Sequence, residues 1–232
     1  MGGSGRGPRT ARVINALTAA WPRLRPLLPA AVITASWSAC LGGDGPLVAF
    51  LGDSLTSGWK LREAEAYPAL LTRALRERGR SVRVLNAGVS GDTVAQGLAR
   101  LPAVLRHRPD ILVVALGIND GLRGLPLEET EAGLRRIVSE AQTGGALVLL
   151  AGVRIPPAPD QDRARRFDEI YPRLAAAYRI PLVPDLLDGV AGNSDLLFPD
   201  RLHPNAAGHA RLAENVRPQL ELLLAQVEAS RR

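Results

Sequence analysis

In LVAFLGDSL, residues 47–55, an unbroken apolar run leads into a turn of glycine and polar residues, and this pattern is the strongest indication of the fold. Such a short run is typical of a strand that is buried on both faces of a parallel sheet. Four further runs rich in Val, Ile and Leu follow at residues 82–85, 111–116, 146–151 and 181–183. We therefore expect five buried parallel strands, the first of them at residues 47–51.

Amphipathic stretches separate these apolar runs. Apolar residues recur three or four positions apart at residues 67–78, 93–105, 127–142, 162–177 and 205–227, and this spacing predicts helices. Alternating strands and helices favour an α/β fold with right-handed crossovers. The sequence thus predicts a three-layer α/β/α sandwich with a flavodoxin-like, five-stranded parallel sheet, as one domain from residue 44 to residue 232.

The composition is that of a globular domain and excludes several other classes of protein. The 232 residues are 46% hydrophobic and 22% charged, which excludes a disordered chain, collagen and a coiled coil. The single cysteine, Cys40, cannot form an internal disulfide, and three histidines with one thiol cannot supply the usual four zinc ligands. We expect neither a structural metal nor a cofactor.

The net charge of +6 comes mainly from the first 43 residues. This leader holds five arginines and no acidic residue, whereas the rest of the chain has 24 basic residues against 23 acidic ones. A surface that follows nucleic-acid phosphates needs clustered positive charge, and the body has no such cluster. We therefore expect no nucleic-acid partner.

The leader, residues 1–43, has the features of an export signal. Its arginines precede an apolar core at residues 27–35 and a small-residue exit, Ser38-Ala39-Cys40. The core is too short to span a bilayer comfortably. The exit also resembles the end of a bacterial lipoprotein signal, in which the cysteine is lipidated, although Trp37 replaces the expected aliphatic residue. We expect a periplasmic protein or one anchored to a membrane through Cys40; the alternative is a cytoplasmic protein with an uncleaved N-terminal extension.

Glycine and polar residues follow the predicted strands at the edge where the crevice of a parallel α/β sheet lies. The first three strands lead into Gly-Asp-Ser-Leu at 52–55, Asn-Ala-Gly-Val-Ser-Gly-Asp-Thr at 86–93 and Gly-Ile-Asn-Asp at 117–120. Asp-Arg-Leu-His-Pro follows at 200–204, after the last strand and a loop. We expect these segments to converge on one functional edge.

Ser54, His203 and Asp200 are the candidate nucleophile, base and orienting acid. A serine hydroxyl needs a base to become a nucleophile, and Asp200 can lie one turn from His203 and hold its imidazole in the correct tautomer. A Gly-Asp-Ser turn by itself is more often a helix cap or an Asx-turn. We interpret His107 and His209 as solvated or structurally satisfied histidines.

Gly91 and Asn119 are candidate donors for the oxyanion that forms when a carbonyl is attacked. Glycine lets a backbone N–H approach closely, and an asparagine amide can reach across the crevice. Taken singly, Gly91 is better explained by a plain turn and Asn119 by a helix cap. Together with Ser54 and the Asp-x-x-His segment they favour a catalytic site.

These four segments resemble the blocks that characterise the SGNH or GDSL hydrolases, named for a serine, glycine, asparagine and histidine. Gly-Asp-Ser-Leu at 52–55, Ser-Gly-Asp-Thr at 90–93, Gly-x-Asn-Asp at 117–120 and Asp-x-x-His-Pro at 200–204 occur in the family's order. The resemblance extends from about residue 47 to residue 227. Residues 91–101 and 119–124 look like the exported bacterial branch that has acyl-CoA thioesterase, arylesterase and lysophospholipase activities.

The resemblance implies a serine hydrolase that cleaves carboxylic esters and thioesters through an acyl-enzyme, without a cofactor. It implies Ser54 as nucleophile, His203 as base, Asp200 as the acid that orients it, and an oxyanion hole formed by the N–H groups of Ser54 and Gly91 and the amide of Asn119. It further implies a mobile substrate loop beside the acyl chain, composed of Gly121, Leu122, Arg123, Gly124, Leu125 and Pro126.

One segment departs from that branch. Residues 154–160, which include Ile155 and Pro156, keep the family's prolines but lack the Asn-Tyr-Gly that often follows them. Because this segment helps to shape the acyl pocket, the preferred chain length stays open. Apolar residues here and in the substrate loop, with Leu197 and Phe198, suggest an apolar acyl group, although core or loop packing is an alternative explanation for each one taken singly.

Three other functions remain alternatives. A metal-dependent phosphoesterase would use Asp53, Asp92, Asp120, Asp200 and His203, but it would leave Ser54 without a task. A non-catalytic carbohydrate- or lipid-binding domain is possible for any fold of this type. Within the hydrolases, a carbohydrate O-acetylesterase would use the same residues on a smaller acyl group.

Overall fold

A computed structural model describes residues 45–156 and 160–231, so the leader and Cys40 lie outside the described residues. The strands are β1 (Leu47–Gly52), β2 (Arg83–Gly88), β3 (Ile111–Ala115), β4 (Leu147–Ala151) and β5 (Leu182–Val183). The longer helices are α3 (Tyr67–Glu77), α4 (Val94–Leu105), α6 (Leu127–Thr143), α7 (Gln161–Asp168), α8 (Ile170–Tyr178) and α9 (Ala206–Ser230). The shorter helical turns are α2 (Ser54–Ser57), α5 (Ile118–Leu122), η1 (Glu63–Glu65) and η2 (Ser194–Leu196).

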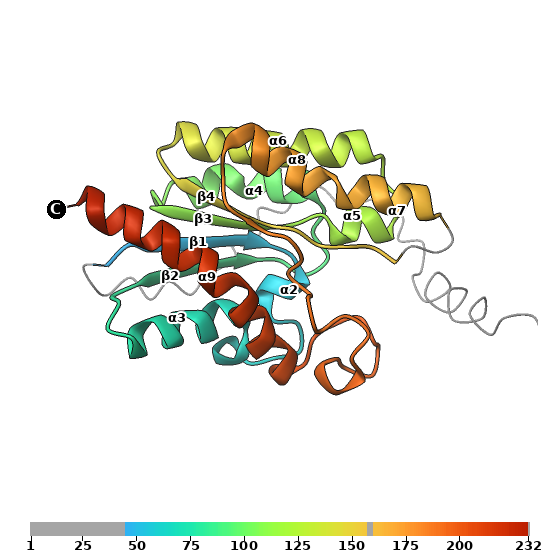
Figure 1. The fold of residues 1–232 in the computed structure, drawn as a ribbon, viewed down its shortest axis with the longest axis horizontal. Coiled ribbons are helices and arrows are strands. Elements are labelled where there is room, and N and C mark those ends of the chain that lie inside the picture. Colours follow the sequence, from blue (N-terminus) through green and yellow to red (C-terminus); the bar gives the residue numbers. More distant parts are fainter. Residues whose placement is uncertain (1–44, 157–159, 232) are drawn as a thin grey trace, which may run out of the picture.

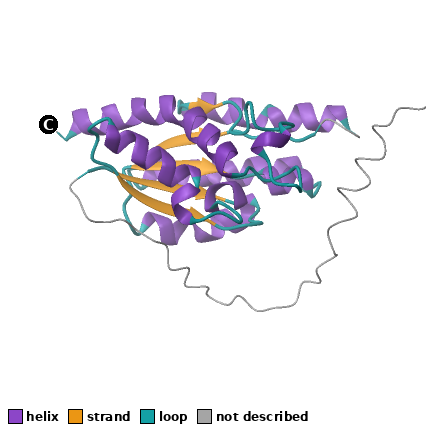
Figure 2. Ribbon diagram, turned by 90° about the horizontal axis from the view of Figure 1, so that it is seen from below, coloured by secondary structure: helices purple, strands orange, loops and turns teal. Residues whose placement is uncertain are grey.

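The five strands form one sheet in the order β2-β1-β3-β4-β5, and every neighbouring pair is parallel. Helices α3 and α9 pack together on one face, and α4, α6 and α8 cover the other (Figures 1 and 2). These are the three layers of an α/β/α sandwich, so the predicted fold class is confirmed.

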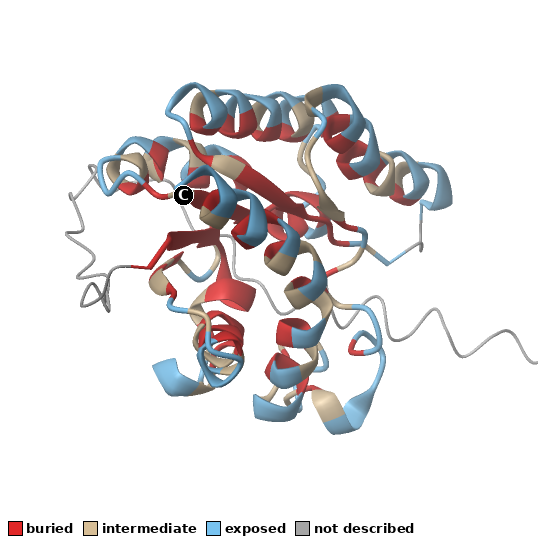
Figure 3. Ribbon diagram, turned by 60° about the vertical axis from the view of Figure 1, so that its left-hand side comes forward, coloured by how far each residue is buried: buried red, intermediate tan, exposed pale blue. Residues whose placement is uncertain are grey.

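The core lies between the sheet and the inward faces of the helices (Figure 3). All residues of β1 and β3 are buried, as expected for central strands that are covered on both faces. The expectation of full burial is wrong for β2 and β5, whose residues are partly half-buried. Each of these is an edge strand with a single neighbouring strand.

The strand register brings the predicted functional segments to the same edge. Gly52 at the end of β1 pairs with Gly88 on one side and with Ala115 on the other. The carboxyl ends of β1, β2 and β3 are therefore level with one another, which is where parallel α/β sheets carry their sites. Strand β2 runs three residues beyond its predicted end, so residues 86–88 belong to the strand and not to a loop.

The predicted helix at 162–177 is wrong in one respect, because the chain forms two helices interrupted at Glu169. Pro172 in the first turn of α8 has no N–H with which to bond the carbonyl of Asp168 four residues earlier. The other four predicted helices are present, with ends shifted by up to three residues. Among the helices of the described residues, none is both long and apolar enough to cross a membrane.

Candidate active site

Ser54 stands at the carboxyl end of the central strand β1. Asp53 caps helix α2, and its Oδ1 accepts a hydrogen bond of 2.9 Å from the N–H of Leu55. Gly58 ends the same helix in the left-handed conformation. Ser54 is thus the first residue of a four-residue helix, and its side chain is largely buried between the strand end and the surface.

Ser54, His203 and Asp200 form a continuous hydrogen-bonded chain. Nε2 of His203 lies 3.1 Å from Oγ of Ser54, although 149 positions separate the two residues in the sequence. Nδ1 of His203 lies 2.9 Å from Oδ2 of Asp200. Because a carboxylate only accepts, Nδ1 carries the hydrogen and Nε2 is left to accept from the serine hydroxyl. The chain is therefore arranged to move a proton from serine to histidine.

Asp200 is fixed in its ionised form by the loop that carries it. Its Oδ1 accepts 3.0 Å hydrogen bonds from the N–H groups of Leu202 and His203, and Oδ2 faces the imidazole. Burial by itself would raise the pKa of Asp200, but the hydrogen bonds from His203 and Leu202 outweigh it and lower the pKa. The loop is closed by an antiparallel bridge between Leu197 and Pro204.

Gly91 and Asn119 lie in the segments that follow β2 and β3. Gly91 has a φ of +85°, a left-handed conformation that favours glycine over residues with a Cβ. Asn119 is buried in the short helix α5, where its Nδ2 donates a 2.9 Å hydrogen bond to the carbonyl of Asp92. This bond uses one of the two amide hydrogens and ties Asn119 to the residue next to Gly91.

The Gly91 segment is also tied to α2 and to the substrate loop. Oγ of Ser57 lies 2.9 Å from Oγ of Ser90, which joins the helix that begins with Ser54 to the Gly91 turn. Arg123 donates a 2.8 Å hydrogen bond to the carbonyl of Gly91. Hydrogen bonds thus join the four predicted blocks at one edge of the sheet.

Three carboxylates beneath this edge differ in how they are held. Asp92 pairs with Arg100 through a 2.8 Å hydrogen bond from Nε, and Oδ2 of Asp120 accepts from the N–H of Val94 at 2.9 Å. Burial raises the pKa of Asp53 to about 7, and the charges of Asp92 and Asp120 add to this effect. Oδ2 of Asp53 is buried without a hydrogen-bond partner among the described residues.

The segments expected to bind the acyl group lie together but are only partly loops. Gly121 and Leu122 belong to α5, which corrects the expectation of a loop from Gly121 onward. A methyl group on Gly121 would collide with the side chain of Ile155, so the two segments are in contact. Leu122 is 38% exposed, whereas Leu197 is buried in the core.

Pro156 and Phe198 complete the apolar residues expected near the acyl group. Pro156 is exposed, and Phe198 is half-buried with its ring edge-on to Trp59. The backbone of Phe198 donates a 2.8 Å hydrogen bond to the carbonyl of His203. Phe198 therefore lies beside His203.

The other two histidines lie outside the hydrogen-bonded chain. His209 is buried on α9, and its Nδ1 accepts a 3.1 Å hydrogen bond from the N–H of Tyr67. Burial lowers the pKa of His209 to about 4. His107 is exposed at the end of α4.

Two contacts at the edge were not predicted from the sequence. The ring of Trp59 lies against the imidazole of His203, with 4.1 Å between ring centroids. The Arg100 guanidinium donates to the carbonyls of Ala87 and Gly52 as well as to Asp92. Sequence spacing carries no signal for the first contact, because it joins a turn near the N-terminal end of the domain to a loop near its C-terminal end.

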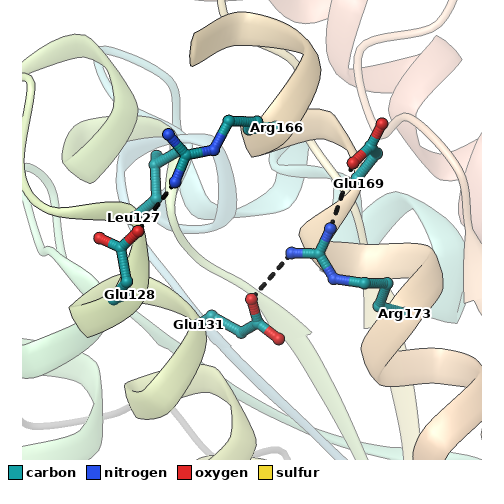
Figure 4. A pocket seen from close by; sticks show the side chains of 6 residues that line it. All are labelled: Leu127, Glu128, Glu131, Arg166, Glu169 and Arg173. Atoms are coloured by element: carbon teal, nitrogen blue, oxygen red, sulfur yellow. Dashed lines mark hydrogen bonds and ion pairs between the residues drawn. The ribbon is translucent and has the colours of Figure 1, made fainter. Parts of the chain in front are cut away.

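A separate pocket lies between α6 and the pair α7 and α8 (Figure 4). Its charged side chains pair with one another: Arg166 with Glu128 at 2.8 Å, and Arg173 with Glu131 at 2.8 Å and with Glu169 at 3.3 Å. Because these charges pair with one another, few charged groups remain to bind a charged ligand. None of the residues that line the pocket belongs to the predicted blocks. The Ser54 edge is therefore the candidate active site.

Comparison with known proteins places this geometry in a family. The family described as GDSL-like Lipase/Acylhydrolase matches residues 50–211. The arylesterase of Vibrio mimicus is 38% identical over 171 residues, covering 73% of this chain and 86% of that protein. The thioesterase 1/protease 1/lysophospholipase L1 of Escherichia coli K12 is 38% identical over 175 residues, covering 75% of this chain and 83% of that protein.

A solved structure agrees with both sequence matches. The crystal structure of TesA superimposes with a TM-score of 0.74 at 39% identity, covering 76% of this chain and 99% of that chain. The family match covers all four blocks at the carboxyl edge of the sheet. The chain therefore belongs to the GDSL-like lipase/acylhydrolase family.

Proposed function

We propose that the protein is a serine hydrolase of carboxylic esters and thioesters, and that Ser54, His203 and Asp200 are its catalytic residues. The observation that carries this proposal is the unbroken chain from Ser54 Oγ through the imidazole to Asp200. Membership of the acylhydrolase family supports the same reaction class. No step of the reaction needs a cofactor.

In the first half of the reaction His203 acts as general base. Nε2 takes the proton of Ser54 while Oγ attacks the carbonyl carbon of the substrate. Asp200 holds the imidazole with Nε2 toward Ser54. It also stabilises the imidazolium that forms, because the backbone N–H groups of Leu202 and His203 keep the Asp200 carboxylate ionised. The imidazolium then gives the proton to the leaving oxygen or sulfur, and an acyl-enzyme on Ser54 remains.

Three donors stabilise the oxyanion in this proposal: the N–H groups of Ser54 and Gly91 and the side-chain amide of Asn119. The N–H of the first residue of a helix has no intrahelical acceptor, which leaves that of Ser54 for substrate. The positive φ of Gly91 allows its N–H to turn toward the site. Asn119 has a second amide hydrogen beyond the one bonded to Asp92.

In the second half of the reaction water replaces the leaving group. His203 removes a proton from the water as it attacks the acyl carbonyl, and returns that proton to Oγ of Ser54 when the carboxylic acid leaves. The same three donors serve this second tetrahedral intermediate. Both halves thus use one set of groups without rearrangement of the fold.

The substrates that we propose are aryl esters, acyl thioesters and lysophospholipids with an apolar acyl group. The names of the similar proteins support these classes, which share an acyl carbonyl. Leu122 and Leu125, beside the Gly121–Ile155 contact, supply apolar surface for the acyl chain. We assign residues 121–126 with Ile155 and Pro156 to the acyl side of the site.

Hydrolysis of p-nitrophenyl esters from acetyl to palmitoyl tests the proposal. We expect activity that is greatest beyond acetyl and that falls about 10⁴-fold or more in Ser54→Ala, with folding unchanged by circular dichroism. Activity on acetyl alone would favour the carbohydrate O-acetylesterase. Undiminished activity in Ser54→Ala would overturn the assignment of the nucleophile.

We also propose that the protein is exported and is either periplasmic or attached to a membrane through lipid on Cys40. The arginines, short apolar core and Ser38-Ala39-Cys40 exit of the leader support this. Cell fractionation of the full-length chain beside Cys40→Ser tests it. A shift of the variant from the membrane to the periplasmic fraction would support the lipid anchor, and periplasmic protein in both would support export without it. Full-length protein in the cytoplasm would refute export.

A further inference from the structure

The imidazole of His203 is hydrogen-bonded through both nitrogens, and one of its faces also contacts an aromatic ring. The Trp59 ring lies 4.1 Å from it between centroids, with the two planes tilted by 31°. Phe198 packs edge-on against the same indole, with 6.2 Å between centroids. The hydrogen bonds to Ser54 and Asp200 act in the plane of the imidazole, whereas Trp59 acts perpendicular to it.

The backbone of Ser54, whose hydroxyl contacts His203, also fixes the position of Trp59. The N–H groups of Gly58 and Trp59 both donate 3.2 Å hydrogen bonds to the carbonyl of Ser54. Gly58, with a φ of +73°, turns the chain there so that the indole comes back over the loop of His203. Trp59 therefore links the backbone of Ser54 to the ring of His203.

We propose that Trp59 is a positioning residue for His203, holding the imidazole with Nε2 toward Ser54 and stabilising its protonated form by a cation–π interaction. The inference rests on the proposed role of His203 as general base. An aromatic face attracts a cation placed over it, and the transfer of the Ser54 proton gives the imidazole that positive charge. Trp59 thus favours the transition state more than the resting enzyme.

Other charged and titratable groups face the same ring system. Asp200 contacts Nδ1, His209 interacts electrostatically with His203 from α9, and the ammonium of Lys60 lies 4.1 Å from the Trp59 centroid. Lys60 draws on the same aromatic electrons as the imidazolium does. Removing the charge of Lys60 should therefore strengthen the cation–π interaction between Trp59 and protonated His203. Lys60→Met is for this reason the matched control for the loss of the aromatic ring in Trp59→Leu.

Kinetics of three variants test the contribution to catalysis. We expect Trp59→Leu to lower kcat about 10-fold with little change in KM, because a cation–π contact is worth on the order of one such factor. Trp59→Phe keeps an aromatic face and should recover most of the loss, and Lys60→Met should not lower kcat. An unchanged kcat in Trp59→Leu, or an equal loss in Trp59→Phe, would overturn the proposal.

Fluorescence tests the contact without relying on activity. In the full-length chain with Trp21→Phe and Trp37→Phe, Trp59 is the only tryptophan. A protonated imidazole in contact with indole quenches its emission, so emission should fall when acidification protonates the ring of His203. We expect His203→Gln to abolish this fall and His107→Gln to preserve it.

The two readouts separate the positioning role from the function on which it rests. A pH-dependent fall that persists in His203→Gln would show that the rings are not in contact and would overturn the proposal. If the fall depends on His203 but Ser54→Ala retains esterase activity, the contact stands while the catalytic assignment fails. Quenching that depends on His203, together with recovery in Trp59→Phe, would establish the positioning role.

Discussion

At the scale of single residues, the site depends on side chains that have two tasks. Asn119 donates one amide hydrogen to the Asp92 carbonyl and, in the proposed mechanism, donates the other to the oxyanion. Asp200 accepts two backbone N–H groups while it orients His203. The hydrogen bonds that place each group therefore also set its charge and its orientation for the reaction.

Asn119→Ala should lower kcat about 100-fold while the protein stays folded, because an oxyanion donor is worth that much when it acts only in the transition state. Steady-state kinetics on a p-nitrophenyl ester, with thermal unfolding as a control for the lost bond to Asp92, measure this. A kcat equal to that of the wild type would remove Asn119 from the oxyanion hole.

Residue patterns predicted the hydrogen-bonded chain but not the ring that covers it. Ser54, Asp200 and His203 were identifiable because a nucleophile, a base and an acid at strand ends have a known chemistry. The Trp59 contact joins two irregular segments whose approach depends on the left-handed turn at Gly58 and on the loop closed by Leu197 and Pro204. Neither feature has a periodicity from which it could be predicted.

At the scale of elements, Arg100 of α4 joins three segments that converge on the site. Its guanidinium donates to the Gly52 carbonyl at the end of β1 at 3.3 Å, to the Ala87 carbonyl of β2 at 2.9 Å, and to Asp92. The Arg100 side chain is 21% exposed and that of Asp92 is 9% exposed. Helix α4 is thus fastened to two strand ends through one largely buried side chain.

Arg100→Met should destabilise the protein by about 3–5 kcal/mol, because it leaves Asp92 buried without its counter-charge. Adding Asp92→Asn should restore part of this loss, since the uncompensated charge is then gone. Chemical unfolding of the two single variants and the double variant measures the coupling. Additive losses would show that the pair does not act as a unit.

Elements were predictable where a pattern repeats and less so where single residues intervene. The buried strands and the helices α3, α4, α6 and α9 follow from apolar runs and from spacing. The break at Glu169 depends on Pro172 alone, and the half-burial of β2 and β5 depends on strand order, which a single sequence does not reveal. Helix α5 is too short to leave a periodic signal.

At the scale of the whole molecule, two buried groups make opposite contributions to stability as the pH changes. Asp53 has a pKa of about 7 in the folded protein against an ordinary value of 3.8, so its contribution falls as the pH rises from 3.8 toward 7. His209 has a pKa of about 4 against 6.5, so its contribution is lost as the pH falls from 6.5 toward 4. The two contributions nearly cancel across the shared range.

Removing one of the two groups by substitution should reveal the pH dependence that the other contributes to the free energy of unfolding. Between about pH 4.5 and 6, Asp53→Asn should make the free energy of unfolding rise with pH more steeply than in the wild type, by about 1.4 kcal/mol per pH unit. His209→Gln should change the slope by the same amount in the opposite direction. Urea unfolding at several pH values measures both; variants with the wild-type slope would contradict a neutral Asp53 and a neutral His209 in the folded protein.

An activated phosphonate that modifies the nucleophile covalently would identify it. The enzyme is treated with a fluorophosphonate ester, activity is followed as it is lost, and the label is located by peptide mass spectrometry. We predict a single phosphonyl group on Ser54, in proportion to inactivation, no label in Ser54→Ala, and much slower labelling in His203→Ala. Inactivation with the label on another residue, or full activity with Ser54 labelled, would contradict the assignment of Ser54 as the nucleophile.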